Sequence, residues 1–319
     1  MDYVHLTKSF TKRDINSPVE TKDKNFRNKL KTNVRLAPLT TFNIGGPARF
    51  YVEPSSLSDL TAAVLWALRN SVPFLILGGG SNVLVHDSGY SGLVIYTGRL
   101  NRLEAHEDTI TAECGVTVDR LVDKSLEQRL TGVEFAAGMP GSTGGAVFMN
   151  ARAVDRSFSD IIEKALALKV GRDAVDSTWL ENNALEFSYK TSVFQKRKFL
   201  VYNVVFKLTK GSAQAIESNI RANKNLRKSK GQYLFPNAGC IFKNSRWIGM
   251  PTGKLIEELG IKGKRIGDAE IFEEHANFII NRGKASADDV YRLIKYIENR
   301  ALQTKGIKLE REINLVGDW

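Results

Sequence analysis

The sequence has only two cysteines among its 319 residues, Cys114 and Cys240, and they lie far apart in the chain. It contains no CxxC pair and no Cys/His spacing of the kind that binds zinc, so we expect neither a disulfide nor a metal site. No apolar run comes close to the roughly 18 to 20 residues that cross a bilayer. The N-terminal MDYVHLTKSF lacks the apolar core of a secretion signal. We therefore expect a cytoplasmic protein that is not inserted in a membrane.

Basic residues outnumber acidic ones by 46 to 35, which gives a net charge of +11. Such an excess is a feature of nucleic-acid-binding proteins. Here it is scattered over short clusters, at 22–31, 196–198, 224–230 and 262–265. No motif of interleaved aromatic and basic residues accompanies these clusters. We therefore expect no nucleic-acid partner, because an anionic small substrate explains the charge at least as well.

Hydrophobic periodicity predicts an α+β protein of two or three domains. Helical spacing of apolar residues indicates helices near 57–68, 117–130, 212–228, 252–260 and 287–297. Ser56 or Ser58 is suited to cap the first of these helices, and Ser286 the last. Apolar runs and alternation indicate strands at 48–54, 74–77, 92–97, 164–170, 200–208, 276–283 and 308–319.

Three glycine-rich loops occur in the first 150 residues: FNIGGPA at 42–48, GGGSN at 78–82 and GMPGSTGGAVFMN at 138–150. Bare glycine backbone lets N–H groups approach an anion closely. The GGGSN loop lacks the GxGxxG spacing of a Rossmann site, and a triple glycine by itself fits a plain tight turn as well. Three such loops together favour one extended ligand with a pyrophosphate, which indicates a dinucleotide cofactor.

Longer motifs in the same order resemble those of the UDP-N-acetylenolpyruvoylglucosamine reductase family. They are YKTSVF at 189–194, PNAGCIFKN at 236–244, GKLIEELGIKGKRIGDAEIFEEHANFIIN at 253–281 and KLEREINLVG at 308–317. The resemblance covers residues 35 to 317. The stretch from 189 to 244 has no room for an inserted tyrosine loop, so it is similar to the shorter of the family's two types.

The resemblance implies a two-part FAD-binding region of the vanillyl-alcohol oxidase-like type, followed by an α+β substrate-binding domain. We expect a basic extension at 1–33, FAD-binding subdomains at 34–100 and 101–209, a substrate-binding domain at 210–306 and a C-terminal strand at 307–319. The cofactor-binding residues implied are Asn43, Gly45, Gly46, Gly78, Gly79, Gly80, Ser81, Asn82, Gly115, Pro140, Gly141, Ser142, Gly144 and Gly145.

The activity implied is reduction by NADPH, through FAD, of the enolpyruvyl ether of UDP-N-acetylglucosamine to a lactyl ether in peptidoglycan precursor synthesis. After hydride delivery to the methylene carbon, an acid must protonate the neighbouring carbon while other groups stabilise its negative charge. The family's acid is a serine, and Cys240 stands in its place. A thiol has a reference pKa of about 8.5, and a nearby cation would lower it further. Glu312 matches the family's catalytic carboxylate, with Glu310 close by on the same face of the expected strand.

Lys190 is the third implied catalytic residue, and it stands where the family has an arginine. A lysine keeps the charge but loses the planar fork that holds a carboxylate. A second departure is NARAVD at 150–155, where Arg152 and Val154 replace small and aromatic residues beside the flavin.

The resemblance also implies substrate-binding positions at Lys228, Asn244 and Glu274. Arg227 and Lys230 are close enough in the chain to leave the choice of the basic residue open. We expect His275 to be a hydrogen-bonded structural histidine rather than a ligand. The protein is expected to be a monomer or a weak oligomer.

Two alternatives remain open on the sequence alone. A related FAD-dependent carbohydrate oxidase would keep the glycine loops but would need neither a proton donor at position 240 nor the glutamate of LEREI. A non-catalytic descendant that binds flavin or nucleic acid is suggested by Lys190, Cys240 and NARAVD taken together.

Overall fold

The structure, a computed structural model, describes residues 24–244 and 246–319. The expected extension at 1–33 therefore lies mostly outside the described residues. Its last part forms helix α1 (Lys24–Lys29) and the beginning of strand β1 (Lys31–Arg35). The ring of Phe26 is buried, and its centroid lies 5.7 Å from that of Trp66.

A four-stranded sheet with the strand order β1-β2-β5-β3 forms the first layer. The strand β1 is antiparallel to β2, whereas β2 and β3 both run parallel to β5. The bounds are Pro47–Val52 for β2, Phe74–Leu77 for β3 and Tyr90–Tyr96 for β5. Helix α2 (Leu57–Arg69) connects β2 to β3, and the Ser56 side chain caps it by accepting a hydrogen bond from the N–H of Asp59. The predicted helix is confirmed, with Ser56 as its cap.

A five-stranded antiparallel sheet with the order β12-β11-β13-β7-β6 forms the second layer. Its strands are β6 (Leu103–His106), β7 (Thr109–Glu113), β11 (Ile162–Val170), β12 (Val175–Glu181) and β13 (Phe199–Lys207). Three helices pack beside it: α3 (Val118–Glu127), α4 (Thr143–Phe148) and α5 (Val193–Lys196). Two short antiparallel strand pairs lie in the same region of the chain. One joins β8 (Leu130–Thr131) to β14 (Thr209–Lys210), and the other joins β9 (Arg152–Ala153) to β10 (Arg156–Ser157).

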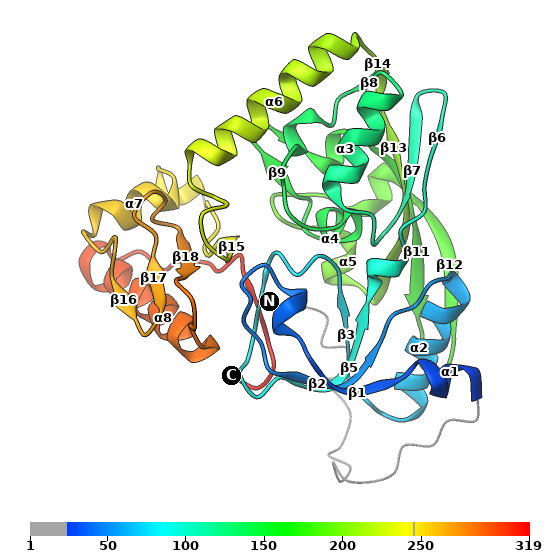
Figure 1. Ribbon diagram of the computed structural model, residues 1–319, viewed down its shortest axis with the longest axis horizontal. Helices are drawn as coiled ribbons and strands as arrows, with labels where there is room; N and C mark the ends of the chain where they lie inside the picture. Colours follow the sequence, from blue (N-terminus) through cyan, green and yellow to red (C-terminus); the bar gives the residue numbers. More distant parts are fainter. Residues whose placement is uncertain (1–23, 245) are drawn as a thin grey trace.

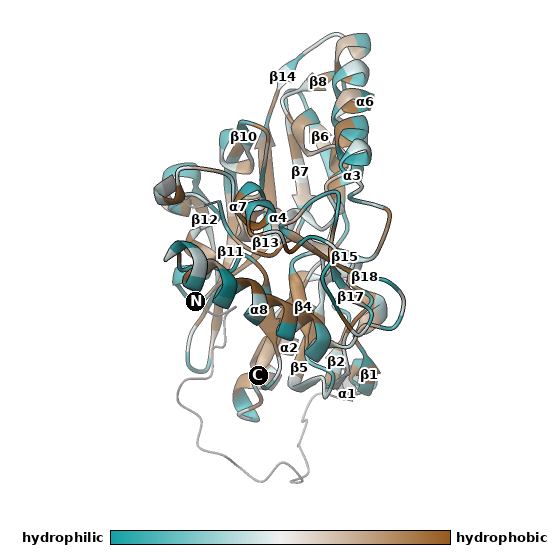
Figure 2. Ribbon diagram, turned by 90° about the vertical axis from the view of Figure 1, so that its left-hand side faces the viewer, coloured by the Kyte–Doolittle hydropathy of each residue, from teal (hydrophilic) through white to brown (hydrophobic). Residues whose placement is uncertain are grey.

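These two sheets share one hydrophobic core. Phe50, Leu93 and Ile95 of the first sheet belong to the same buried cluster as Ala165 and Phe206 of the second. Burying one such side chain contributes roughly 1.5–3 kcal/mol to folding. Figure 2 shows the hydrophobic residues concentrated in the strands at the middle of the molecule, with hydrophilic residues along helix α6 at its edge.

A third sheet follows helix α6 (Ala213–Ser229), which runs from the second sheet toward it (Figure 1). This antiparallel sheet has the order β15-β18-β17-β16. Its strands are β15 (Asn237–Cys240), β16 (Arg265–Ile266), β17 (Ala269–Ile271) and β18 (Phe278–Asn281), and its helices are α7 (Thr252–Glu258) and α8 (Ala287–Lys305). The fold is therefore α+β. We propose domain boundaries near residues 100 and 209, which separate the three sheets along the chain, and near 306, where the C-terminal segment begins.

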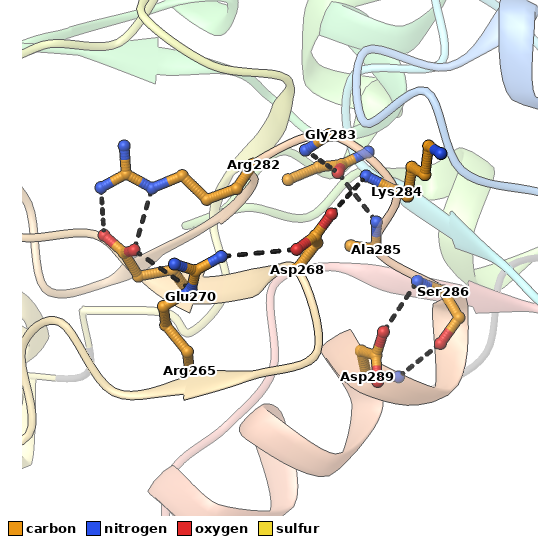
Figure 3. Close-up of polar contacts among 10 residues, drawn as sticks. Arg265, Asp268, Glu270, Arg282, Gly283, Lys284, Ala285, Ser286 and Asp289 are labelled. Atoms are coloured by element: carbon orange, nitrogen blue, oxygen red, sulfur yellow. Dashed lines mark hydrogen bonds and ion pairs between the residues drawn. The ribbon is translucent and has the colours of Figure 1, made fainter.

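An ion pair between a buried carboxylate and a half-exposed guanidinium holds the third sheet together (Figure 3). Glu270 on β17 is 4% exposed and accepts hydrogen bonds of 2.9 and 2.8 Å from the guanidinium of Arg282. Arg265 lies 3.8 Å from the same carboxylate. At the start of α8, the Ser286 and Asp289 side chains each accept a hydrogen bond from the other residue's backbone N–H.

The C-terminal segment crosses from the third sheet to the first layer. The strand β19 (Asn314–Val316) is parallel to β4 (Val83–Val85), and Arg311 forms an isolated antiparallel bridge with Phe242. The prediction of one strand over 308–319 is therefore wrong, because its first half and its second half pair with different domains. Among the described residues, no helix is both long enough and apolar enough to span a bilayer.

Candidate active site

A cavity of about 410 Å³ opens where the glycine loops, the end of α6, the turn before Cys240 and the crossing segment meet. The cavity is lined by all three predicted catalytic residues, Cys240, Glu312 and Lys190. Residues far apart in the sequence are thus brought to one place. Elsewhere in the described part of the chain, His, Cys, Asp and Glu side chains form no group that could hold a metal ion.

Most of the predicted cofactor residues border this cavity. Those that line it are Gly78, Gly79, Gly80, Ser81, Asn82, Pro140, Gly141, Ser142 and Gly145. Those that do not are Asn43, Gly45, Gly46, Gly115 and Gly144. A smaller apolar cavity of about 60 Å³, bordered by Gly144, adjoins the first through Gly78, Ser142 and Gly145.

Two of the glycine loops touch each other along one wall of the cavity. A Cβ atom on Gly79 would lie 2.5 Å from the Cα of Gly141, closer than any side chain tolerates. Gly141 itself has a φ of +120°, where L-residues with side chains are strained. The loops at 78–82 and 138–150 therefore need glycine to pack together as well as to admit a ligand.

The amide groups of these loops are available to a ligand. Within the described residues, no hydrogen-bond acceptor receives the backbone N–H groups of residues 78–82, Gly141 or Ser142. Backbone donors without partners around a concave surface favour an anion such as a pyrophosphate. Among the described residues that line the cavity, Glu312 carries the only carboxylate. The donor set therefore fits the diphosphate of FAD.

The turn that carries Cys240 is fixed by Asn237. The Asn237 side chain donates to the carbonyls of Gln232 and Phe235 and accepts from the N–H of Gly239. The pairing of β15 with β18 changes register between Asn237 and Cys240, so the strand bulges there. Gly239 takes a φ of +72° within this bulge, with open space where a side chain would be.

The thiol of Cys240 is held in its protonated form. Burial and the nearby carboxylate of Glu312 raise its pKa to about 12, although Lys190 and Lys230 act in the opposite direction. The two neighbouring cations do act to lower this pKa, as expected, but the net shift is upward because the cost of burying a thiolate exceeds their attraction. A thiol with this pKa stays neutral at physiological pH and can serve as a proton donor.

Lys190 and Glu312 form an ion pair beside this thiol. The Nζ atom of Lys190 lies 2.5 Å from Oε1 of Glu312, and the side chains are only 15% and 11% exposed. Lys190 occupies a tight turn between Ser188 and Thr191 and has a φ of +56°. Glu310, by contrast, is 61% exposed and pairs with Lys243. The structure therefore distinguishes the two glutamates of LEREI and puts Glu312 inside the cavity.

The glycine loop at 78–82 also supports Glu312. The Asn82 amide donates to the carbonyl of Glu312 at 3.1 Å, and the N–H of Asn314 donates to the carbonyl of Asn82. On the other side, the N–H of Glu312 donates to the carbonyl of Ile241, next to Cys240. The position of the carboxylate therefore depends on both the cofactor loop and the turn that carries the thiol.

The predicted substrate residues are divided between the cavity and the surface. Asn244 lines the cavity, whereas Lys228 and Glu274 are exposed outside it. Arg227 and Lys230 line the cavity in place of Lys228. Arg227 is committed to structure, because it donates to the carbonyls of Ala137 and Phe135. Lys230 is thus the free basic residue at the end of α6.

The expectation of a hydrogen-bonded His275 is wrong for one ring nitrogen. The Nδ1 atom is buried and has no hydrogen-bond partner among the described residues, and burial lowers the pKa of the ring. The ring packs against Phe278, with centroids 4.3 Å apart. His275 is therefore a packing residue.

Sequence reasoning assigned no role to Arg152, Tyr189 or Tyr233, all of which contribute to the site. The Tyr189 hydroxyl accepts a hydrogen bond from the N–H of Asn244, and the guanidinium of Arg152 lies 5.5 Å from the centroid of the Tyr189 ring. Tyr233 lines the cavity and donates to the carbonyl of Gly138. Only Arg152 had a signal in the sequence, as a departure from the family's pattern.

Both halves of the chain match family models. Residues 48–170 match the FAD binding domain, and residues 230–316 match the C-terminal domain of UDP-N-acetylenolpyruvoylglucosamine reductase.

Relatives and a solved structure agree with these matches. Curated proteins named UDP-N-acetylenolpyruvoylglucosamine reductase are 36% identical over 306 residues in Clostridium novyi and 40% identical over 292 residues in Anoxybacillus flavithermus. These alignments cover 96% and 90% of this chain, and 97% and 94% of the relatives. The crystal structure of the reductase (MurB) from Thermus caldophilus superimposes with a TM-score of 0.76 at 30% identity, covering 90% of this chain and 98% of that one. This chain belongs to the UDP-N-acetylenolpyruvoylglucosamine reductase family.

Proposed function

We propose that this protein is an FAD-dependent oxidoreductase that uses NADPH to reduce UDP-N-acetylglucosamine enolpyruvate to UDP-N-acetylmuramate, a step of peptidoglycan precursor synthesis. The observation that supports it best is the meeting of Cys240, the Lys190–Glu312 pair and the glycine loops in one cavity. These are the parts that this reaction needs: a proton donor, a site for developing negative charge and a cradle for a dinucleotide.

The residues that would hold FAD are the free amides of 78–82 and of Gly141 and Ser142. FAD held there would supply the two-electron redox chemistry that links NADPH to the methylene carbon of the substrate. The packed contact between Gly79 and Gly141 fixes the two loops relative to each other, so the amides are oriented before the cofactor binds.

Cys240 would complete the reduction by giving its proton to the carbon that carries the carboxylate. The S–H bond breaks, a C–H bond forms, and the negative charge passes from carbon to sulfur. The raised pKa of the thiol ensures that the proton is present before the transfer. The same raised pKa makes the resulting thiolate a strong base, which regains a proton from solvent before the next turnover.

Lys190 and Glu312 would control charge at this carbon. The ammonium group of Lys190 neutralises the carboxylate of Glu312, so the cavity can accept a substrate that is itself an anion. Their side chains are largely buried, which strengthens their electrostatic effect on a charge that develops beside them.

We further propose that the reaction takes place in the cytoplasm, where NADPH and nucleotide sugars are made, and that the protein acts as a monomer or weak oligomer. The net charge of +11 would attract its anionic substrates.

The two alternatives have less support. An oxidase acting on a simple carbohydrate has no use for the half-buried Cys240 and the Lys190–Glu312 pair in the same cavity. A non-catalytic descendant would need neither a paired carboxylate in the cavity nor the bulge that presents Cys240.

The absorption spectrum of the purified protein tests the proposal. We expect a yellow protein whose flavin absorption is bleached by NADPH without oxygen and restored by the enolpyruvyl sugar nucleotide. A colourless protein that does not take up added FAD would refute it, and so would a bleached protein that the substrate leaves unchanged.

A further inference from the structure

The cavity contains a guanidinium group with no charged partner. Four cationic side chains line it: Arg152, Lys190, Arg227 and Lys230. Lys190 is paired with Glu312, and Arg227 donates to backbone carbonyls. The side chain of Arg152 is exposed, and among the described residues it forms neither an ion pair nor a hydrogen bond, only the contact with the ring of Tyr189. Of the described residues that line the cavity, it is therefore the one arginine that is free to bind an anion, and Lys230 at the end of α6 is the free lysine.

Arg152 is nevertheless held in place. It begins the short hairpin of β9 and β10, and its guanidinium lies over the ring of Tyr189 at 5.5 Å. The hydroxyl of Tyr189 is fixed in turn by the N–H of Asn244 at 3.0 Å. An arginine stacked on an aromatic ring keeps its planar fork available for a carboxylate.

The contact with Tyr189 brings Arg152 to the reactive end of the cavity. Tyr189 precedes Lys190 in the same tight turn, and its hydroxyl is near enough to Glu312 and Lys190 for both of their charges to act on its pKa. The carboxylate of the enolpyruvyl group is bonded to the carbon that Cys240 would protonate. The diphosphate of the same substrate is separated from that carbon by the whole hexose ring.

We propose that Arg152 binds the carboxylate of the substrate through two parallel hydrogen bonds, while Lys190 holds Glu312. This inference rests on the proposed function and assigns a further binding residue to the same site. Lys190 is a poor candidate for that contact, because its ammonium group is a compact charge already engaged at 2.5 Å. The two tasks of binding the carboxylate and controlling the glutamate are thus carried out by two side chains.

Binding of the substrate and of its methyl ester, which lacks the negative charge, tests the proposal. Dissociation constants are measured on FAD-loaded protein without NADPH, for wild type, Arg152→Gln and Arg152→Lys. We expect Arg152→Gln to reduce the preference for substrate over ester by about 10- to 100-fold and Arg152→Lys to reduce it less, because a charged bidentate contact is lost or weakened. Arg156→Gln is the matched control, since Arg156 lies in the same hairpin and pairs with Asp160 on the surface.

Three results would overturn the assignment of Arg152. Both affinities could stay unchanged in Arg152→Gln; both could fall equally, which leaves the preference for substrate over ester unchanged; or the variant could lose its flavin, which would put the guanidinium on the cofactor instead. Failure of the proposed function looks different, because the wild-type protein itself would then neither bind nor reduce the enolpyruvyl substrate.

Discussion

The Nζ atom of Lys190 lies 2.5 Å from Oε1 of Glu312, and this contact joins a tight turn of the second layer to the segment where the chain crosses between domains. Glu312 raises the pKa of the Cys240 thiol and Lys190 lowers it. The pair therefore limits the net charge next to the proton donor. Its loss would affect both the binding of an anionic substrate and the proton transfer.

Replacement of Lys190 tests this relationship. We expect Lys190→Gln to lower kcat/KM by about 100-fold or more, because the Glu312 carboxylate then repels the substrate and the developing charge. Lys190→Arg should keep or raise turnover, since the positive charge is retained and the planar guanidinium can form two hydrogen bonds to a carboxylate. Steady-state kinetics checks both, with Lys243→Gln, which removes the pair with the exposed Glu310, as a control near wild-type activity. A large loss in Lys190→Arg would instead show that the pocket is built around lysine.

Cys240 should react slowly with alkylating reagents, although its thiol borders an open cavity. With a pKa of about 12 rather than 9.0, its thiolate is scarcer by roughly a thousandfold at pH 8. We expect iodoacetamide to alkylate it at least 100-fold more slowly than free cysteine, with a rate that keeps rising with pH above 9. The rate is measured by mass spectrometry in a Cys114→Ser variant, so that one thiol remains. A rate that levels off near pH 8 would contradict the raised pKa.

The contact between the glycine loops predicts the effect of Gly79→Ala. The new Cβ would lie 2.5 Å from the Cα of Gly141, so the two loops must separate and their amides no longer converge. We expect affinity for FAD to fall at least tenfold, measured by flavin absorbance after dialysis. Gly283→Ala is the matched control, because a Cβ there lies 3.6 Å from the nearest atom, an oxygen of Asp268. Full flavin content in Gly79→Ala would show that the two loops can separate without loss of affinity for FAD.

The buried carboxylate of Glu270 lies outside the active-site cavity, and its removal should lower the stability of the fold. We expect Glu270→Ala to lower the free energy of unfolding by roughly 1–3 kcal/mol, since Arg282 loses both hydrogen bonds but is exposed enough to be rehydrated. Glu257→Ala, which removes an exposed pair with Lys262, should change it by about 0.5 kcal/mol or less. Urea denaturation measures the free energy of unfolding of both variants. An equal loss in the two variants would mean that the buried pair of Glu270 contributes no more to stability than an exposed pair.

Local signals in the sequence predicted much of the fold and the composition of the site. The helix after Ser56, the helix after Ser286 and the turn of small residues before Cys240 lie where the patterns indicated. The glycine loops were recognisable because bare backbone is required wherever chain and ligand approach closely. The catalytic residues came from the resemblance, since no periodicity distinguishes Glu312 from Glu310.

Features that depend on long-range contacts could not be predicted. The tail at 308–319 alternates like one strand, but only the folded chain shows its halves pairing with different domains. Lys228 and Lys230 look equivalent in a basic run, and the direction in which α6 ends decides that Lys230 faces the cavity. The pKa of Cys240 depends on burial by residues distant in sequence.

The central claim is that Cys240 donates the proton that completes the reduction. Its most direct test is stopped-flow absorbance, without oxygen, of wild type, Cys240→Ser and Cys240→Ala. We predict that NADPH bleaches the flavin at similar rates in all three, and that its recovery with the enolpyruvyl substrate is slowed about 100- to 10,000-fold in Cys240→Ala but much less in Cys240→Ser. Recovery at the wild-type rate in Cys240→Ala would contradict the claim, as would an equal loss in both half-reactions.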